Sequence, residues 1–254
     1  MTKTHRKRRS SWRNVTYSIA FIALTVSAIY VTLFSTPNEA ASPPVVVEPE
    51  KEEEETPTPP QETTSSANQD EDIKQVALTF DDGPDPKVTM QVLATLAKYD
   101  AKATFFMLGN RVEDYPEIAK KVQEAGHQLG NHSWTHPNLT KASAEKIQSE
   151  INATSAIIET ITGQKATVFR PPYGAVNETV RGQTNLPVIL WDVDTLDWQH
   201  RDPNQLLTNV KSTTKDGSTI LMHDIHQSTA DGLDAVLAYL QSEGYTFVTY
   251  SDLK

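Results

Sequence analysis

The sequence predicts an α/β fold for residues 71–254, with strands and helices alternating along the chain. Short apolar runs recur, longer helical patterns such as 116–125 and 142–161 separate them, and polar, ionisable side chains follow the runs directly. Such an alternation is typical of a parallel sheet or barrel, whose sites lie at the carboxyl ends of the strands. The runs lie at 75–80, 103–108, around 128–130, 167–169, 187–193, 218–222 and 245–248.

Composition excludes several classes of protein. The chain has 254 residues and no cysteine, so a disulfide framework, a thiolate metal site and a cysteine nucleophile are excluded. Any bound metal must therefore be held by histidine, aspartate or glutamate. The net charge of −10 argues against a nucleic-acid-binding protein, and the mean hydropathy of −0.47 excludes a polytopic membrane protein.

The first element is an expected membrane anchor. Residues 1–14 form a basic segment with six Lys or Arg and no acidic residue, and residues 15–34 carry no charge. A helix of this length covers about 30 Å, which matches the hydrocarbon core of a bilayer, and the preceding basic residues predict a cytoplasmic N-terminus. We therefore expect a single-pass signal anchor in the cell membrane, with the rest of the chain extracellular and facing the cell wall.

Other interpretations of the N-terminal segment fit less well. A cleaved signal peptide usually has an apolar region of about 7–15 residues and an A-x-A-like site, but Asn38 and Glu39 stand two residues before Ala40 and Ala41. The even scatter of apolar side chains disfavours an amphipathic core helix, and the apolar stretch disfavours a nucleic-acid-binding arm. The sequence leaves open whether the anchor is ever cleaved.

Residues 35–70 are expected to form a disordered linker. They contain seven prolines, nine acidic residues, one lysine and no aromatic residue, a composition that cannot bury a core. If extended, such a segment could hold a domain up to roughly 100 Å from the membrane. The Glu52–Glu55 run is interpreted as solvated charge.

Five segments of residues 71–254 carry the candidate chemistry. Each segment follows or ends one of the apolar runs and contains ionisable side chains. A loop that only connects two elements does not require such side chains. The segments are Thr79–Pro84, Asn131–His136, Arg170–Gly174, Trp191–Trp198 and Leu221–Asp224.

His132 and His136 are the first candidate metal ligands, because a spacing of four places two imidazoles on one face of a helical turn. The pair alone is weak evidence. Asp81 and Asp82 strengthen it, since one carboxylate can join the histidines while the other faces the substrate as a base. Two histidines and one carboxylate suit a divalent first-row metal, most often zinc, with open positions for catalysis. Asp-Asp-Gly-Pro is also good turn sequence, which does not explain the histidines.

The five segments, in this order, resemble the five motifs of the NodB-homology polysaccharide deacetylases, carbohydrate esterase family 4. The resemblance spans essentially all of residues 71–254. It implies a distorted (β/α) barrel that binds Zn²⁺, Co²⁺ or another divalent first-row metal and removes acetyl groups from sugars.

The resemblance also implies roles for the residues of the first three segments. Asp81 is expected to be the general base that takes a proton from the attacking water, and Arg170 to orient it. The two prolines after Arg170 themselves fix the chain, which suits a rigid wall of the site, so Pro172 is expected to face the substrate. The expected metal ligands are Asp82, His132 and His136.

The resemblance implies further roles for Tyr173 in the third segment and for residues of the fourth and fifth segments. The backbone N–H of Tyr173 is expected to stabilise the oxyanion, while its side chain lines the groove. His223 is expected to be the general acid, held by Asp194. Trp198 and Leu221 are expected to line the pocket for the acetyl group.

Several further residues receive no catalytic role at this point. Asp192 and Asp197 lie in the fourth segment without a clear assignment. The other histidines are interpreted as structural or solvent-exposed, and two tryptophans as core; these residues are His127, His200, His226, Trp134 and Trp191.

The expected function is metal-dependent deacetylation of N-acetylglucosamine in peptidoglycan, because an anchor and a long linker favour an insoluble neighbouring polymer. Chitin oligomers, poly-N-acetylglucosamine and acetylxylan are alternative substrates that the motifs do not separate. An inactive glycan-binding relative is a further alternative, and the intact base, acid and metal ligands argue against it. The metal, the oligomeric state and any separate role of the linker stay open.

Overall fold

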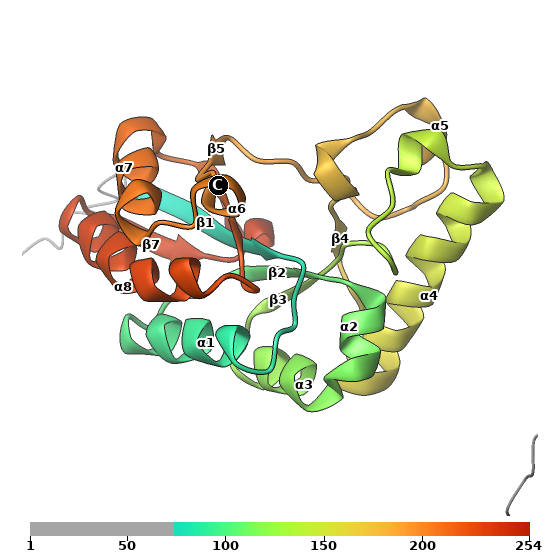
Figure 1. The fold of residues 1–254 in the computed structure, drawn as a ribbon, viewed down its shortest axis with the longest axis horizontal. Helices are drawn as coiled ribbons and strands as arrows, with labels where there is room; N and C mark the ends of the chain where they lie inside the picture. The colour runs from blue at the N-terminus through green and yellow to red at the C-terminus, as the bar shows by residue number, and fades with distance from the viewer. Residues whose placement is uncertain (1–73) are drawn as a thin grey trace, which may run out of the picture. The chain divides into compact units, whose positions relative to one another are not determined.

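The computed structural model describes residues 74–254 and confirms the parallel α/β fold (Figure 1). Every strand pairing in this part of the chain is parallel, and the strand order is β4-β3-β2-β1-β6-β5, with β7 beside the first half of β1. The strands are β1 (Lys74–Asp81), β2 (Thr104–Met107), β3 (Gln128–Asn131), β4 (Val168–Phe169), β5 (Val193–Asp194), β6 (Ser218–His223) and β7 (Tyr245–Val248).

Helices surround the sheet (Figure 1). Neighbouring helices contact each other in the order α4-α3-α1-α8-α7, which runs in the same direction as the strand order from β4 to β5. The longer helices are α1 (Val88–Lys98), α3 (Pro116–Glu124), α4 (Ala144–Thr162), α7 (Pro203–Thr213) and α8 (Gln227–Ser242). The shorter ones are α2 (Gly109–Asp114), α5 (Glu178–Arg181) and α6 (Asp197–His200), with 3-10 turns at Leu139–Lys141, Pro172–Gly174 and Tyr250–Asp252. The predicted helices at 116–125 and 142–161 correspond to α3 and α4.

Strand β1 lies in the centre of the sheet, and its burial explains why the strands appear in the sequence as apolar runs. Val76, Leu78 and Phe80 are completely buried, and so is Ala77 on the opposite face. A parallel strand that is covered on both faces has no solvent side, so its sequence is a continuous apolar run. Val76, Leu78 and Phe80 form the main hydrophobic core together with residues of α1 and α8.

The predicted strand at 187–193 is wrong for most of its length, because only Val193 lies in regular strand β5. The start of this segment pairs with β4: Val188 forms a parallel bridge with Phe169, and Ile189 donates its N–H to the Phe169 carbonyl at 2.8 Å. Its end pairs with β6, where Asp192 N–H donates to the Thr219 carbonyl at 3.0 Å. One irregular segment thus spans the gap between the two edges of the sheet and cannot keep a single strand register.

Both ends of the described chain lie at the amino ends of the strands. Lys74 opens β1, and the backbone N–H of Lys254 donates to Gln75 Oε1 at 3.1 Å. Asp81 closes β1, and an eight-residue strand places it roughly 23 Å from Lys74. The segments expected to be the basic terminus, the anchor and the linker, residues 1–14, 15–34 and 35–70, lie outside the described residues. Within residues 74–254, no helix has the length and apolar character needed to cross a bilayer.

Candidate active site

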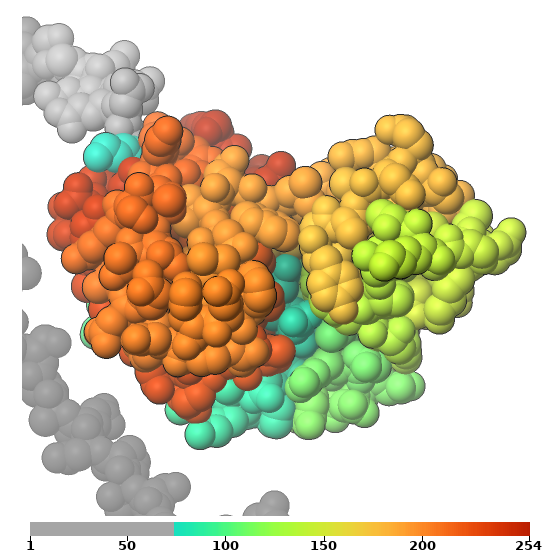
Figure 2. Space-filling model, turned by 45° about the horizontal axis from the view of Figure 1, so that its top comes forward, coloured from blue at the N-terminus to red at the C-terminus, as the bar shows by residue number. Residues whose placement is uncertain are grey.

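A cavity of about 600 Å³ opens at the carboxyl ends of the strands. Figure 2 shows the hollow between the orange part of the chain, which includes α6 and α7, and golden and yellow-green parts on the other side, with teal residues at its floor. The residues that line it come from all five predicted segments, with Arg201 after the fourth segment and two residues after the fifth in addition. They are Asp81, Asp82, His132, His136, Tyr173, Trp191, Asp194, Trp198, Arg201, Leu221, His223, Ile225 and His226.

The three predicted metal ligands lie together. Asp82 Oδ1 is 3.6 Å from His132 Nε2 and 3.4 Å from His136 Nε2, and one donor atom from each of the three residues lies within 4.8 Å of the others. Asp82 Oδ1 is buried and accepts no hydrogen bond from the described residues. A bare, buried carboxylate oxygen that faces two imidazole nitrogens fits a bound cation, because such an oxygen is otherwise costly to desolvate.

His132 is prepared for metal binding by its surroundings. Its Nδ1–H donates to the Arg170 carbonyl at 2.6 Å, which fixes the tautomer and leaves the Nε2 lone pair toward Asp82. Burial lowers the pKa of His132 to about 3, so the ring is neutral at physiological pH. A neutral imidazole whose second nitrogen is held by a carbonyl is the form that binds metal ions.

His132 and His136 lie together as predicted, but the helical turn expected from their spacing is wrong. His132 and His136 do not lie on a helical turn; they lie on a loop that follows β3. Ser133 and His136 adopt left-handed backbone conformations, with φ of 69° and 59°, so the chain curls back instead of forming a helix. The curl places the centres of the two imidazole rings 5.0 Å apart.

Glu150, on helix α4, holds this loop and was missed in the sequence. Its buried carboxylate accepts the N–H groups of Trp134 and Thr135, both at 2.8 Å, and the Thr135 hydroxyl at 2.9 Å. Lys146 Nζ lies 2.7 Å from the other side of the carboxylate. The signal in the sequence is a glutamate placed on the buried stripe of α4 between Ile147 and Ile151, where an apolar residue is normally expected.

We expect Glu150→Gln to weaken metal affinity by about 10- to 100-fold, the usual effect of losing a residue that orients metal ligands. The amide keeps the size of the side chain and one acceptor oxygen, but its NH₂ end cannot accept from the Thr135 hydroxyl or from Lys146, so the loop that carries His136 is held less firmly. Competition with a chromophoric chelator measures the change. Glu145→Gln, on the exposed side of the same helix, is the matched control, and equal affinities of the two variants would contradict the role.

The predicted contact between Arg170 and Asp81 is present. Arg170 is completely buried, and its NH1 donates to Asp81 Oδ1 and to Thr79 Oγ1, both at 2.8 Å. Its NH2 donates to the Leu190 carbonyl at 2.9 Å. Burial raises the pKa of Asp81, and the Arg170 charge opposes that rise. The second oxygen of Asp81, Oδ2, lies 3.6 Å from His132 Nε2.

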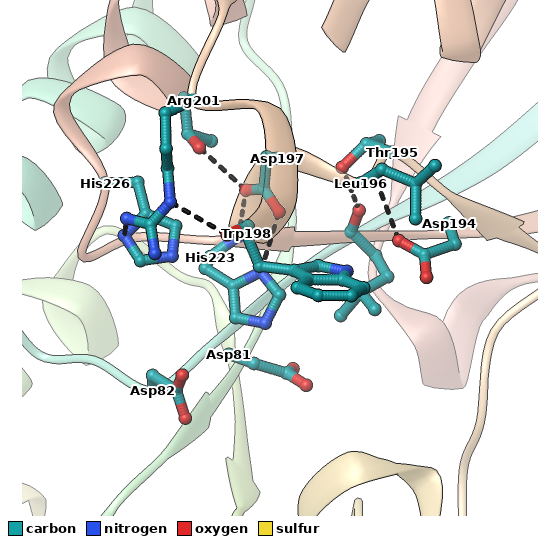
Figure 3. A network of polar contacts seen from close by, with 12 residues as sticks. Asp81, Asp82, Asp194, Thr195, Leu196, Asp197, Trp198, Arg201, His223 and His226 are labelled. Atoms are coloured by element: carbon teal, nitrogen blue, oxygen red, sulfur yellow. Dashed lines mark hydrogen bonds and ion pairs between the residues drawn. The ribbon is translucent and has the colours of Figure 1, made fainter.

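His223, the predicted general acid, is held by Asp197. His223 Nδ1–H donates to Asp197 Oδ1 at 2.8 Å, and the His223 backbone N–H donates to Asp197 Oδ2 at 2.7 Å (Figure 3). Thr229 donates its hydroxyl to the same Oδ2 at 2.7 Å. Burial disfavours the protonated ring, but the hydrogen bond and the charge of Asp197 outweigh it and raise the pKa of His223 to about 9. The ring therefore carries its proton at neutral pH.

The expectation that Asp194 holds His223 is wrong. Asp194 lines the cavity, but its Oδ1 accepts the backbone N–H of Leu196 at 2.9 Å and lies to the side of His223 (Figure 3). Leu196 has a left-handed backbone, with φ of 54°, which turns the chain into α6 and brings Asp197 back under the imidazole. No residue pattern in the segment announces that turn.

The predicted substrate-facing residues differ in exposure. Tyr173 is 66% exposed, has φ of 62°, and packs its ring edge-to-face against His136. Trp198 is 47% exposed on the cavity wall, while Leu221 contributes a nearly buried side chain. Pro172 is buried in the same turn as Tyr173 and is not among the lining residues. Trp191, expected in the core, lines the cavity instead.

Two further lining residues received no role from the sequence. His226, expected to be structural or exposed, is buried at the cavity, and its ring centre lies 5.5 Å from that of His223. Arg201 lines the same wall and contacts His226 Nδ1 through NH1 (Figure 3). Arg201 lies just beyond the fourth segment and His226 just beyond the fifth, so the five segments do not include them.

The amino-acid sequence is similar to those of known polysaccharide deacetylases. A family model described as polysaccharide deacetylase matches residues 68–186. The chain is 45% identical over 185 residues to the peptidoglycan-N-acetylmuramic acid deacetylase PdaC of Bacillus subtilis, which covers 73% of this chain and 40% of that protein. It is 47% identical over 180 residues to the peptidoglycan-N-acetylglucosamine deacetylase PgdA of Listeria monocytogenes, covering 71% and 39%.

The structure is similar as well. The solved structure of peptidoglycan deacetylase PdaC from Bacillus subtilis matches with a TM-score of 0.69 and 46% identity, over 71% of this chain and 89% of that one. The chain spans about 40% of the length of the two curated relatives. The shared sequence, the shared fold and the site geometry together show that this chain belongs to the polysaccharide deacetylase family.

Proposed function

We propose that this protein hydrolyses the acetamide of N-acetylglucosamine residues in cell-wall peptidoglycan. The observation that carries the proposal is the pairing of two fixed groups at one cavity: Asp81, tethered by Arg170, and a protonated His223, held by Asp197. A carboxylate that can accept a proton and an imidazolium that can donate one are what amide hydrolysis requires.

A divalent metal completes the proposed site. Asp82, His132 and His136 would hold it, and Zn²⁺, Co²⁺ or another first-row ion suits this donor set. When bound, such an ion polarises the acetamide carbonyl and makes water a better nucleophile near neutral pH.

The chain's own groups then move the protons. Asp81 Oδ2 accepts a proton from the water that attacks the acetyl carbon, while Arg170 keeps Oδ1 in place. The backbone N–H of Tyr173 is assigned to the developing oxyanion. The carbon–nitrogen bond breaks as His223 gives its proton to the leaving nitrogen, so acetate and a free amino sugar are the products. Trp198 and Leu221 supply apolar surface for the acetyl methyl group.

The choice of polymer is supported by the relatives, whose names give peptidoglycan as the substrate. Chitin oligomers, poly-N-acetylglucosamine and acetylxylan remain alternative substrates of the same site. An inactive glycan-binding protein is disfavoured, because binding alone requires no buried Arg170–Asp81 pair and no protonated His223.

The test is acetate release by the full chain, purified in detergent and loaded with metal, from peptidoglycan and from N-acetylglucosamine oligomers side by side. We expect release from peptidoglycan, with removal of the metal by a chelator abolishing it. Bound metal without any acetate release would favour the glycan-binding alternative.

We also propose that residues 15–34 anchor the protein in the cell membrane, with the N-terminus in the cytoplasm and the catalytic domain facing the cell wall. The basic segment before them and their length support this. Protease added outside cells whose wall has been removed should then digest the domain, and full protection would contradict the topology.

A further inference from the structure

Arg201 stands at the cavity with no role in the hydrolysis described above. Among the residues of the described chain that line the cavity, it is the one lysine or arginine. The ion pairs found within residues 74–254 do not include it. An arginine usually pairs with a carboxylate or phosphate, so an exposed guanidinium without such a partner is a candidate for ligand binding.

Two contacts fix the position of this guanidinium. Arg201 Nε donates to the Trp198 carbonyl at 2.9 Å, and NH1 donates to His226 Nδ1 (Figure 3). Burial, with the Arg201 charge in addition, lowers the pKa of His226, so this histidine is a neutral acceptor. A neutral acceptor orients the cation without cancelling its charge, and the remaining N–H groups of the fork stay available to a ligand.

The charges around the cavity indicate what the ligand must carry. Asp81 is paired with Arg170, and Asp82 belongs to the proposed metal site, whereas Arg201, beside exposed Trp198, has no carboxylate partner among the described residues. An indole next to a guanidinium suits an extended sugar that carries a negative group, since the sugar packs on the ring and the anion binds the fork. A neutral sugar would use only the indole.

We propose that Arg201 binds a carboxylate of the cell-wall glycan on a residue next to the reacting sugar. The site would thereby prefer carboxylate-bearing strands to neutral N-acetylglucosamine oligomers. This inference rests on the proposed function and specifies its substrate further. Peptidoglycan offers such a carboxylate from two sources, the lactyl group of a muramic acid residue without its peptide, and the stem peptide itself.

The experiment compares kcat/KM on four substrates: a neutral N-acetylglucosamine oligomer, strands with stem peptides, strands stripped of peptides by an amidase, and stripped strands with methyl-esterified carboxyls. The enzymes are the full chain and its Arg201→Gln and Arg201→Lys variants. Arg181→Gln, which removes an exposed arginine from α5 outside the cavity, is the matched control for net charge.

We expect Arg201→Gln to lose about tenfold in kcat/KM on carboxylate-bearing strands relative to the neutral oligomer, mainly through KM, a factor that corresponds to one lost charged contact. Arg201→Lys should recover part of the loss, and Arg181→Gln should show none of the selectivity change. Methyl esterification should weaken the unsubstituted enzyme by a similar factor and leave Arg201→Gln unaffected. Whether peptide-bearing or stripped strands show the larger effect identifies the source of the carboxylate.

An equal loss on all four substrates would overturn the inference, because Arg201 would then only support the turn that carries Trp198. Equilibrium binding of stripped strands to Asp81→Asn and to Asp81→Asn/Arg201→Gln decides the question without turnover, and equal Kd values would overturn it too. A tenfold difference in Kd without acetate release by the unsubstituted enzyme would support the carboxylate site while contradicting the proposed deacetylation.

Discussion

Asp81→Asn is expected to reduce kcat for acetate release by about three orders of magnitude, the scale at which general base catalysis contributes. The amide has nearly the same shape, but it cannot accept the proton of the attacking water. Arg170 would lose its charged partner in a fully buried position, although its contacts with Thr79 and Leu190 remain. Steady-state acetate release, measured together with bound metal per chain, checks the prediction.

The control for this prediction is Asp82→Asn, the neighbouring carboxylate. Asp82 faces His132 and His136, so its change should remove metal from the protein, whereas Asp81→Asn should keep metal. Turnover by Asp81→Asn within tenfold of the unsubstituted enzyme would show that another group takes the proton.

Asp197→Asn is expected to lower kcat about 100-fold at pH 8 and to move the alkaline limb of the pH profile toward neutrality. Asp197 raises the pKa of His223 to about 9, so the imidazole keeps its proton below that pH and loses it above. Without the carboxylate charge, burial becomes the dominant influence and lowers the pKa, so the proton needed by the leaving amine is lost at lower pH. The pH dependence of kcat measures both effects.

Asp194→Asn provides the matched comparison, because Asp194 lies at the same cavity and in the same segment without contacting His223 Nδ1. Its substitution should leave the alkaline limb where it is. If Asp194→Asn moved that limb and Asp197→Asn did not, the assignment made from the sequence would be restored.

The fold was largely predictable because buried parallel strands are written as continuous apolar runs. Phe80 and Leu78 have protein on both sides, and their run was found at its true position. The segment 187–193 is also apolar, but it divides its hydrogen bonds between two edges of the sheet. The apolar character of this segment predicts that it is buried, but it does not predict which strand the segment pairs with.

The site was predictable where a residue follows directly from a strand, and less so where a turn decides. Asp82 and His132 are fixed by the ends of β1 and β3, so their position in the chain was sufficient. Asp197 depends on the left-handed Leu196, a conformation that leucine rarely adopts and that composition cannot indicate. Glu150 supports the loop that carries His132 and His136 from helix α4, and only the tertiary structure brings the helix and the loop together.

The placement of the two chain ends affects how this domain can be connected to other parts. Lys74 and Lys254 lie together at the amino ends of the strands, and the cavity opens at the carboxyl ends. Lys74 and Lys254 are therefore on the side of the domain opposite the cavity. A fusion partner added after Lys254 is thus attached on the side opposite the cavity, and its point of attachment leaves the opening free for a large ligand.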